Sequence, residues 1–285
     1  SATTGEFDAD NPAIVADLAD DAVPATTFGL VIEALARRKD RGMAPFTIMS
    51  CDNIEGNGHM AQSTFTTFAR LKDPALAAWI QAEGAFPNSM VDRITPVTTP
   101  EVTEQLSLRY AIDDQWPVAG EPFTQWVLED NFSLGRPDFE KVGVQFVDDV
   151  SPFELMKLRI LNGGHATIAY PGGLMGIHYV HEAMEHPLIR AFLRKLVETE
   201  IIPMVPPVPD TDTNAYFDLI EQRFSNPKIG DTIQRLCLDG SNRQPKLILP
   251  TVNDRLCDDD STEELPLVSA LWCRYCYGET ESGSP

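Results

Sequence analysis

The chain has 285 residues, of which 43% are hydrophobic, a composition that is typical of globular proteins and excludes collagen-like, low-complexity and disordered chains. Its 43 Asp and Glu against 22 Lys and Arg give a formal net charge of −21, which argues against a nucleic-acid partner because phosphate contacts need clustered cations. No apolar stretch approaches the ~18 residues of a transmembrane helix, so no membrane span is expected.

Residues 1–147 alternate helical and strand patterns along the chain. Apolar periodicity and capping residues predict helices over 27–41, 59–71, 74–83 and 99–110, and short apolar runs predict strands over 46–50, 89–94, 125–128 and 142–147. Such alternation predicts an α/β domain with a mostly parallel sheet.

The pattern changes at Ser151-Pro152-Phe153-Glu154, where Ser, Pro and Glu have the spacing of a capping box at a helix start. Mainly helical patterns follow over 188–202 and 213–224, and a further helix is expected from the cap at 231–234 to Asp239-Gly240. We therefore expect two domains, an α/β domain over 1–148 and a mainly helical domain over 149–285.

Ser1 to Gly5 has neither a basic nor an apolar segment, so no signal peptide is expected. Five Cys, an odd number in a chain of this length, do not form a disulfide framework. These features predict a cytoplasmic protein. We expect a monomer or a weak oligomer.

Three motifs resemble known sites without matching them. The glycine motif Gly56–Ala61 fits G-x-G-x-x-A, but five residues separate it from the predicted strand, which favours a turn at a helix start over phosphate binding. His181 and His186 are one residue too far apart for a zinc-binding H-E-x-x-H, and Cys273 and Cys276 are expected to be buried small residues on a helix. No metal is therefore predicted.

Lys157, Asn162 and His165 form the most informative polar group. At the α-helical ~100° per residue, Asn162 lies about 140° and His165 about 80° from Lys157, so all three can border one cleft. Apolar neighbours would desolvate the Lys157 amine and lower its pKa, as a general base requires. The spacing alone equally allows a surface Lys, a capping Asn and a helix end.

A second polar group follows the predicted strands. Asp52-Asn53 comes after the first strand and Asp92-Arg93 after the second. Ligands of open α/β sheets bind at the carboxyl ends of strands, although Asp and Asn are also common in turns.

Four motifs occur in order: Ser50-Cys51-Asp52-Asn53 with Gly56-Asn57-Gly58, Met90-Val91-Asp92-Arg93-Ile94-Thr95-Pro96, Lys157-x4-Asn162-x2-His165, and Arg235-Leu236-Cys237-x-Asp239-Gly240-Ser241. Together they resemble the polyol-specific long-chain dehydrogenases over essentially the whole chain. The resemblance implies a Rossmann-type domain, a mainly helical domain and an active site between them. It also implies metal-free oxidation of a sugar alcohol such as mannitol to a ketose such as fructose, with NAD or NADP.

The resemblance further implies roles for individual residues. Lys157 is the expected general base, and Asn53 and Asn162 are the expected hydrogen-bond donors to the alkoxide. The expected substrate contacts are His165, Asp92, Arg235, Arg243 and, near a proton path, Glu154. The expected cofactor contacts are Asn53, Val91 and Asp92.

The sequence also departs from the family pattern, in which a strand and a glycine-rich dinucleotide turn come first. We expect that this chain begins within the Rossmann-type domain and ends before the last helices of the family. Two alternatives stay open: a reductase of the sugar acids fructuronate or tagaturonate, and a non-catalytic fragment without a cofactor site. A neutral polyol is favoured because the carboxylate of Asp92 would repel a sugar acid.

Overall fold

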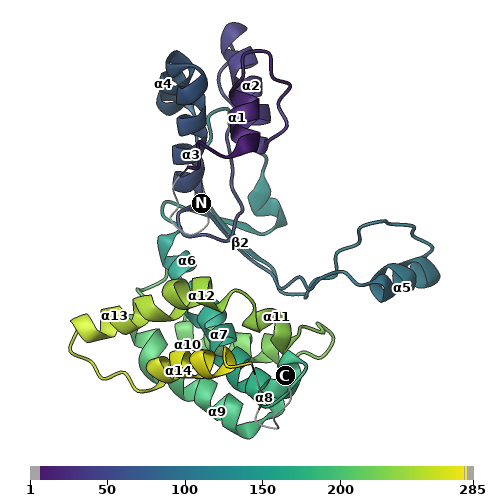
Figure 1. Cartoon of the computed structure of the whole chain (residues 1–285), viewed down its shortest axis with the longest axis vertical. Helices are drawn as coiled ribbons and strands as arrows, with labels where there is room; N and C mark the ends of the chain where they lie inside the picture. The colour runs from purple at the N-terminus through teal and green to yellow at the C-terminus, as the bar shows by residue number, and fades with distance from the viewer. Residues whose placement is uncertain (1–6, 279, 281–285) are drawn as a thin grey trace. The chain divides into compact units, whose positions relative to one another are not determined.

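The computed structural model describes residues 7–278 and 280, and the chain divides into two compact units. The first unit comprises residues 1–91 and 125–151, and the second comprises residues 92–124 and 152–285. The α/β and mainly helical classes predicted for the two parts of the chain are confirmed (Figure 1). The boundary at 148/149 stays a prediction, and residues 92–124 belong to the second unit.

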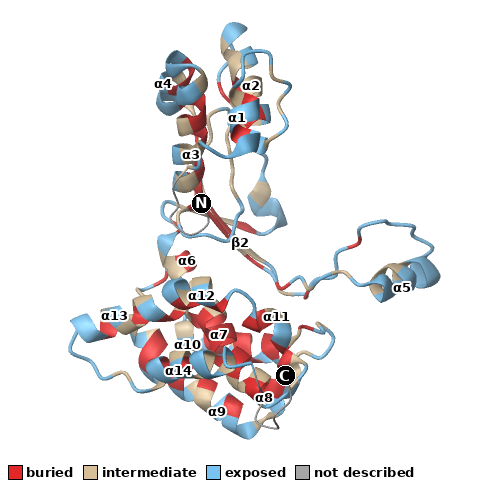
Figure 2. Cartoon of the chain, viewed as in Figure 1, coloured by how far each residue is buried: buried red, intermediate tan, exposed pale blue. Residues whose placement is uncertain are grey.

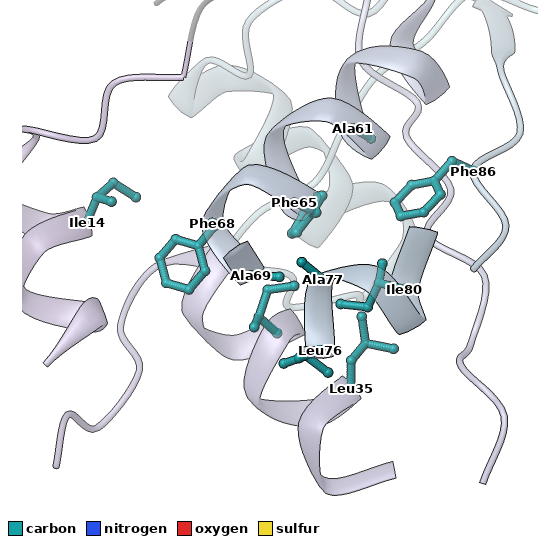
Figure 3. Packing of buried hydrophobic residues seen from close by; sticks show 11 residues of the cluster. Ile14, Leu35, Ala61, Phe65, Phe68, Ala69, Leu76, Ala77, Ile80 and Phe86 are labelled. Carbon is teal, nitrogen blue, oxygen red and sulfur yellow. The ribbon is translucent and has the colours of Figure 1, made fainter. Parts of the chain in front are cut away.

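Helices form the core of the first unit. They are α1 (Pro12–Leu18), α2 (Thr27–Asp40), α3 (Asn57–Lys72) and α4 (Pro74–Glu83), and three of them begin at the side-chain caps Asn11, Thr26 and Asp73. Their apolar faces meet around the fully buried Leu35, Phe68 and Ile80 (Figure 3). Helices α2, α3 and α4 confirm the predicted helices.

A small sheet completes the first unit. Its strands are β1 (Ser89–Asp92), β2 (Gln125–Glu129) and β3 (Val144–Val147), in the order β1-β2-β3. Strands β2 and β3 run parallel, with Trp126 opposite Val144 and Glu129 opposite Val147, and a 3-10 turn, η1 (Phe139–Val142), leads into β3. The three strands confirm three of the four predicted ones.

The predicted strand over 46–50 is wrong. This segment is extended. Within the described residues it makes one backbone–backbone hydrogen bond, from the Ile48 amide to the Ala85 carbonyl, at 3.0 Å. Side chains supply the remaining bonds: the Ser133 hydroxyl donates to the carbonyl of the preceding Pro45, the Ser133 amide donates to the Thr47 hydroxyl, and the Ser89 hydroxyl donates to the Ser50 carbonyl. A strand needs a continuous ladder, and these side-chain bonds do not supply one.

One long helical stretch runs through the second unit, from Ser151 to Leu174. It consists of α6 (Ser151–Met156), the π-helical segment η2 (Lys157–Asn162) and α7 (Gly163–Leu174). The elements around it are α5 (Pro100–Tyr110), α8 (Val180–Glu185), α9 (Pro187–Leu196), η3 (Val197–Ile201), η4 (Ile202–Met204), α10 (Thr213–Phe224), α11 (Ile233–Cys237), α12 (Gly240–Arg243), η5 (Gln244–Ile248), α13 (Leu249–Cys257) and α14 (Glu264–Tyr275).

Helix α7 lies at the centre of this unit, and ten of its twelve residues are buried (Figure 2). Helix α5 is the opposite case, because none of its residues is buried. The predicted helices over 99–110, 188–202 and 213–224 are confirmed, whereas the helix expected to end at Asp239-Gly240 ends at Cys237. Asp239 adopts a left-handed conformation (φ 60°), which interrupts the helix before α12 begins. No helix among the described residues is long and apolar enough to cross a membrane.

Candidate active site

The π-helical segment η2 begins at Lys157 and ends at Asn162. A π-helix bonds residue i to residue i+5, so five residues complete somewhat more than one turn. The expected angle of 140° between Lys157 and Asn162 assumed α-helical geometry and is therefore wrong. The wider turn brings the two side chains closer to one face than an α-helix would, and His165 follows one turn later on α7.

Burial dominates the electrostatics of Lys157, which is only 9% exposed. Loss of hydration lowers the pKa of its amine, and the nearby Arg223 guanidinium lowers it further. The carboxylates of Asp92 and Glu154 act in the opposite direction without outweighing burial. The predicted direction of the Lys157 pKa shift is confirmed.

Asp92 is held in a buried ion-pair cluster, which we call the Arg223 cluster and which comprises Asp92, Glu121 and Arg223. The Arg223 guanidinium donates to both Asp92 oxygens, at 2.7 and 2.9 Å, and to Glu121, at 2.7–3.2 Å. The Tyr216 hydroxyl donates to Asp92 at 3.2 Å. Each of the three charged side chains is at most 4% exposed. The negative charge of Asp92 is thus balanced by the Arg223 guanidinium, and both of its oxygens are hydrogen-bonded.

Sequence reasoning missed Arg223 and Glu121. One available signal was the position of Arg223 on α10, where it shares the buried face with Tyr216, seven residues earlier, and with Ile220. A charge on an apolar helix face requires a buried partner. The sequence offered no comparable signal for Glu121, which lies in a segment without regular structure.

His165 stacks on the Phe224 ring, with 4.1 Å between ring centroids and 16° between ring planes. Burial lowers the pKa of its imidazole to about 3, so the ring is neutral at physiological pH. Its Nε2 atom has no hydrogen-bond partner among the described residues. His165, Arg223 and Asp231 line a small cavity.

The two predicted arginines differ in their surroundings. Arg235 donates from Nε to Asp231 Oδ1 at 2.5 Å and from Nη2 to Asp231 Oδ2. Arg243 donates from Nη1 to the Leu236 carbonyl at 2.8 Å. Both act electrostatically on His165, as does Asp231, which sequence reasoning also missed.

Asn53 and Val91 belong to the first unit, and Asn57 connects the segments that carry them. The Asn57 side-chain amide donates to the Asp52 carbonyl at 2.9 Å and to the Ser89 carbonyl at 2.8 Å, and its oxygen accepts from the Ser89 amide. Asn53 itself is exposed, and its backbone amide donates to the side chain of Asp52. Asn57 thus ties the Asn53 loop to strand β1.

The weaker motifs have structural explanations. Gly56 is the left-handed cap (φ 61°) of α3, as favoured for the glycine motif. Cys273 and Cys276 are exposed on and just beyond α14, so the expectation that they are buried is wrong. Cys273 lies about 140° around the helix from the buried Val268. The described residues contain no group of three or more side chains arranged to hold a metal ion.

Comparison with known proteins identifies the family of both parts of the chain. Residues 9–141 match the family profile described as the mannitol dehydrogenase Rossmann domain, and residues 149–285 match the mannitol dehydrogenase C-terminal domain. The chain belongs to the mannitol dehydrogenase family.

Curated relatives of this family show strong similarity. The chain is 56% identical over 280 residues to mannitol 2-dehydrogenase of Cereibacter sphaeroides, covering 98% of this chain and 58% of the relative. It is 46% identical to mannitol 2-dehydrogenase of Aspergillus terreus, over 98% of this chain and 57% of the relative. The chain therefore spans somewhat more than half the length of these relatives.

Two solved structures show the same fold. The Pseudomonas fluorescens mannitol 2-dehydrogenase in a ternary complex with NAD and D-mannitol matches with a TM-score of 0.88 and 46% identity, over 99% of this chain and 57% of that chain. A D-sorbitol dehydrogenase in substrate-free form matches with a TM-score of 0.91 and 38% identity, over 100% of this chain and 59% of that chain.

Proposed function

We propose that the protein oxidises a sugar alcohol such as mannitol to a ketose such as fructose, and catalyses the reverse reaction, with NAD or NADP. The observation that carries this proposal is the burial of Lys157, which lowers the pKa of its amine in the π-helical segment that begins at Lys157 and ends at Asn162. Family membership and the NAD and mannitol named for the Pseudomonas fluorescens relative support the substrate and cofactor.

Lys157 acts as the general base. Its neutral amine accepts the proton of the substrate hydroxyl, and the carboxylates of Asp92 and Glu154 partly stabilise the ammonium that results. The amides of Asn162 and Asn53 donate hydrogen bonds to the oxygen as negative charge develops on it. A donor of this kind is typically worth ~3 kcal/mol of barrier lowering.

Two of the proposed cofactor contacts, Asn53 and Val91, belong to the first unit. Asn57 holds the Asn53 loop against β1, which carries Val91, so both contacts come from segments tied together at one sheet strand. Bound NAD or NADP would supply the acceptor for the hydride of the substrate carbon. Asn53, Val91 and Asp92 are the proposed contacts.

Asp92 distinguishes a polyol dehydrogenase from a sugar-acid reductase less sharply than expected. Both Asp92 oxygens are bonded to Arg223, so this carboxylate presents less free negative charge to a substrate. The neutral polyol is now favoured by the names of the relatives, mannitol 2-dehydrogenase above all. A cytoplasmic location and a monomeric or weakly oligomeric state remain predictions.

Replacing Lys157 tests the proposed base. In the protein at its full natural length, Lys157→Ala should lower kcat for mannitol oxidation by about 10²–10⁴-fold, because general bases contribute this much. Affinity for NAD, measured by isothermal titration calorimetry, should change little. Lys195→Ala is the matched control, since Lys195 pairs with Glu264 on the surface.

Two results would contradict the proposal. An equal loss in His165→Ala, with no rescue of either variant by an added primary amine, would show that Lys157 is not the base. Failure of the unaltered protein to bind NAD would instead favour the non-catalytic alternative. Higher kcat/KM for mannonate than for mannitol would favour the sugar-acid reductase.

A further inference from the structure

Arg235 is fixed by a carboxylate that is almost completely buried. The Asp231 side chain is 5% exposed, and it binds the guanidinium of Arg235 side-on, through Nε and Nη2. This planar two-bond geometry leaves a guanidinium little freedom to rotate. The Nη1 group has no protein hydrogen bond among the described residues, so it remains available as a donor.

Asp231 is itself held in place by the backbone. Its Oδ1 accepts from the Thr232 amide at 2.9 Å, and its carbonyl accepts from the Val180 amide at 3.0 Å. An antiparallel bridge joins Thr232 to Tyr179, and the Ile233 amide donates to the His178 carbonyl. Asp231 therefore sits on a bridged turn between the starts of α8 and α11, which is a rigid support.

The pair borders the proposed site. Asp231 lines the same cavity as His165 and His181, and both members of the pair act electrostatically on the His165 ring. The other cations that act on His165 are Arg223 and Arg243.

Two of the guanidinium groups that act on His165, those of Arg223 and Arg235, are paired with carboxylates. Arg223 lies between Asp92 and Glu121, and Asp231 pairs with Arg235. Guanidinium groups paired in this way give an anionic substrate little Coulombic advantage, whereas the donors and acceptors of the site suit hydroxyl groups.

We propose that Asp231 is a specificity-determining residue, which orients and neutralises Arg235 so that the site accepts a neutral polyol in preference to a sugar acid. Arg235 then serves as a hydrogen-bond donor rather than as a free cation. This inference rests on the proposed function, because it concerns the substrate of the same reaction.

The test compares a polyol with a sugar acid. For the protein at its full natural length, kcat/KM is measured at pH 8 with mannitol and with mannonate, whose carboxylate adds one negative charge. Asp231→Asn should raise the mannonate-to-mannitol ratio at least tenfold, mainly through a lower KM for mannonate, because it leaves Arg235 without its counter-charge. Asp231→Glu, which keeps the charge, should restore the low ratio.

Two further variants separate this effect from general damage. In Asp231→Asn/Arg235→Gln the gain in ratio should disappear, because the released cation is gone. Asp218→Asn, which removes a surface partner of Arg194, should leave the ratio unchanged. If Asp231→Asn does not fold, inhibition of the unaltered protein decides: a paired Arg235 predicts weak inhibition of mannitol oxidation by mannonate, insensitive to ionic strength.

An unchanged ratio in Asp231→Asn, or tight and salt-sensitive inhibition of the unaltered protein by mannonate, would overturn the inference. These results differ from failure of the proposed function, in which the unaltered protein would oxidise no polyol at all.

Discussion

Burial lowers the pKa of both Lys157 and His165, but with different consequences for catalysis. With a pKa of about 3, the His165 imidazole has too little proton affinity to keep the proton of a substrate hydroxyl at neutral pH. Lys157 starts from 10.5, so a lowered pKa brings its amine towards the working pH. His165 is therefore suited to donate and accept hydrogen bonds as a neutral ring.

The same His165 pKa has a consequence for stability. The imidazole has a pKa near 6.5 when unfolded and about 3 when folded, so below pH 6.5 the unfolded chain binds more protons. His165 thus contributes stability that is fully present above pH 6.5 and is lost as the pH falls. Between pH 7 and pH 5 the loss should be about 2 kcal/mol.

Urea unfolding at several pH values measures this contribution. His165→Phe keeps a ring against Phe224 and removes the titration, so its free energy of unfolding should fall about 2 kcal/mol less over the same interval. Parallel pH curves for the variant and the unaltered protein would show that the imidazole is not buried as described.

At the scale of the element, helix α14 depends on a carboxylate from another element. Glu200, on η3, is 3% exposed and accepts hydrogen bonds from the amides of Glu263, Glu264 and Leu265, at 2.7–2.9 Å. These amides lie at the start of α14, where the helix dipole also favours negative charge. Burial alone would raise the Glu200 pKa, but the amides outweigh it and lower the pKa.

Glu200→Gln should therefore destabilise the protein by about 2–3 kcal/mol, because the charge assistance of three hydrogen bonds to a buried carboxylate is lost. Glu198→Gln on the same element is the control, since Glu198 forms an exposed pair with Arg194 and should cost ~0.5 kcal/mol or less. Thermal unfolding compares the two variants, and equal destabilisation would refute this account of α14.

The elements show what local sequence can and cannot predict. Helices such as α10 were predictable because their caps and apolar periods are local, as with the Asp212 cap. The strand over 46–50 failed because a strand exists only with a ladder partner, which local sequence does not reveal. The π-helical segment also lacked a signal, because six residues are too few to distinguish its period from that of an α-helix.

At the scale of the whole molecule, the predicted fold class was correct because helix and strand patterns alternate over residues 1–147, whereas the rest of the chain shows helical patterns alone. Within the site, Lys157, Asn162 and His165 were found because they lie on one continuous helical stretch. The bond between Asp92 and Arg223 joins residues 131 positions apart, and no local pattern predicts such a pair. Arg223 and Glu121 were thus missed because they enter the site through long-range ion pairs, whereas Asp231 was missed although its partner Arg235 lies only four residues later.

The net charge of −21 makes a further prediction for the entire molecule. An excess of like charge repels itself most strongly in the compact state, and salt screens this repulsion with a Debye length of ~8 Å at physiological ionic strength. Screening also weakens surface ion pairs such as Arg136 with Asp130 and Glu140. Exposed ion pairs contribute only ~0–1 kcal/mol each to the free energy of folding. The repulsion among the unpaired carboxylates should therefore dominate the effect of salt on stability.

Raising NaCl from about 10 mM to about 200 mM should therefore increase Tm, with most of the increase complete by physiological ionic strength. KCl should give the same curve, because screening depends on ionic strength rather than on the identity of the ion. Sucrose, which stabilises by exclusion from the surface, should not reproduce the early saturation. A Tm that is constant or falls over this range would mean that surface ion pairs, and not the excess of carboxylates, dominate the electrostatic free energy of folding.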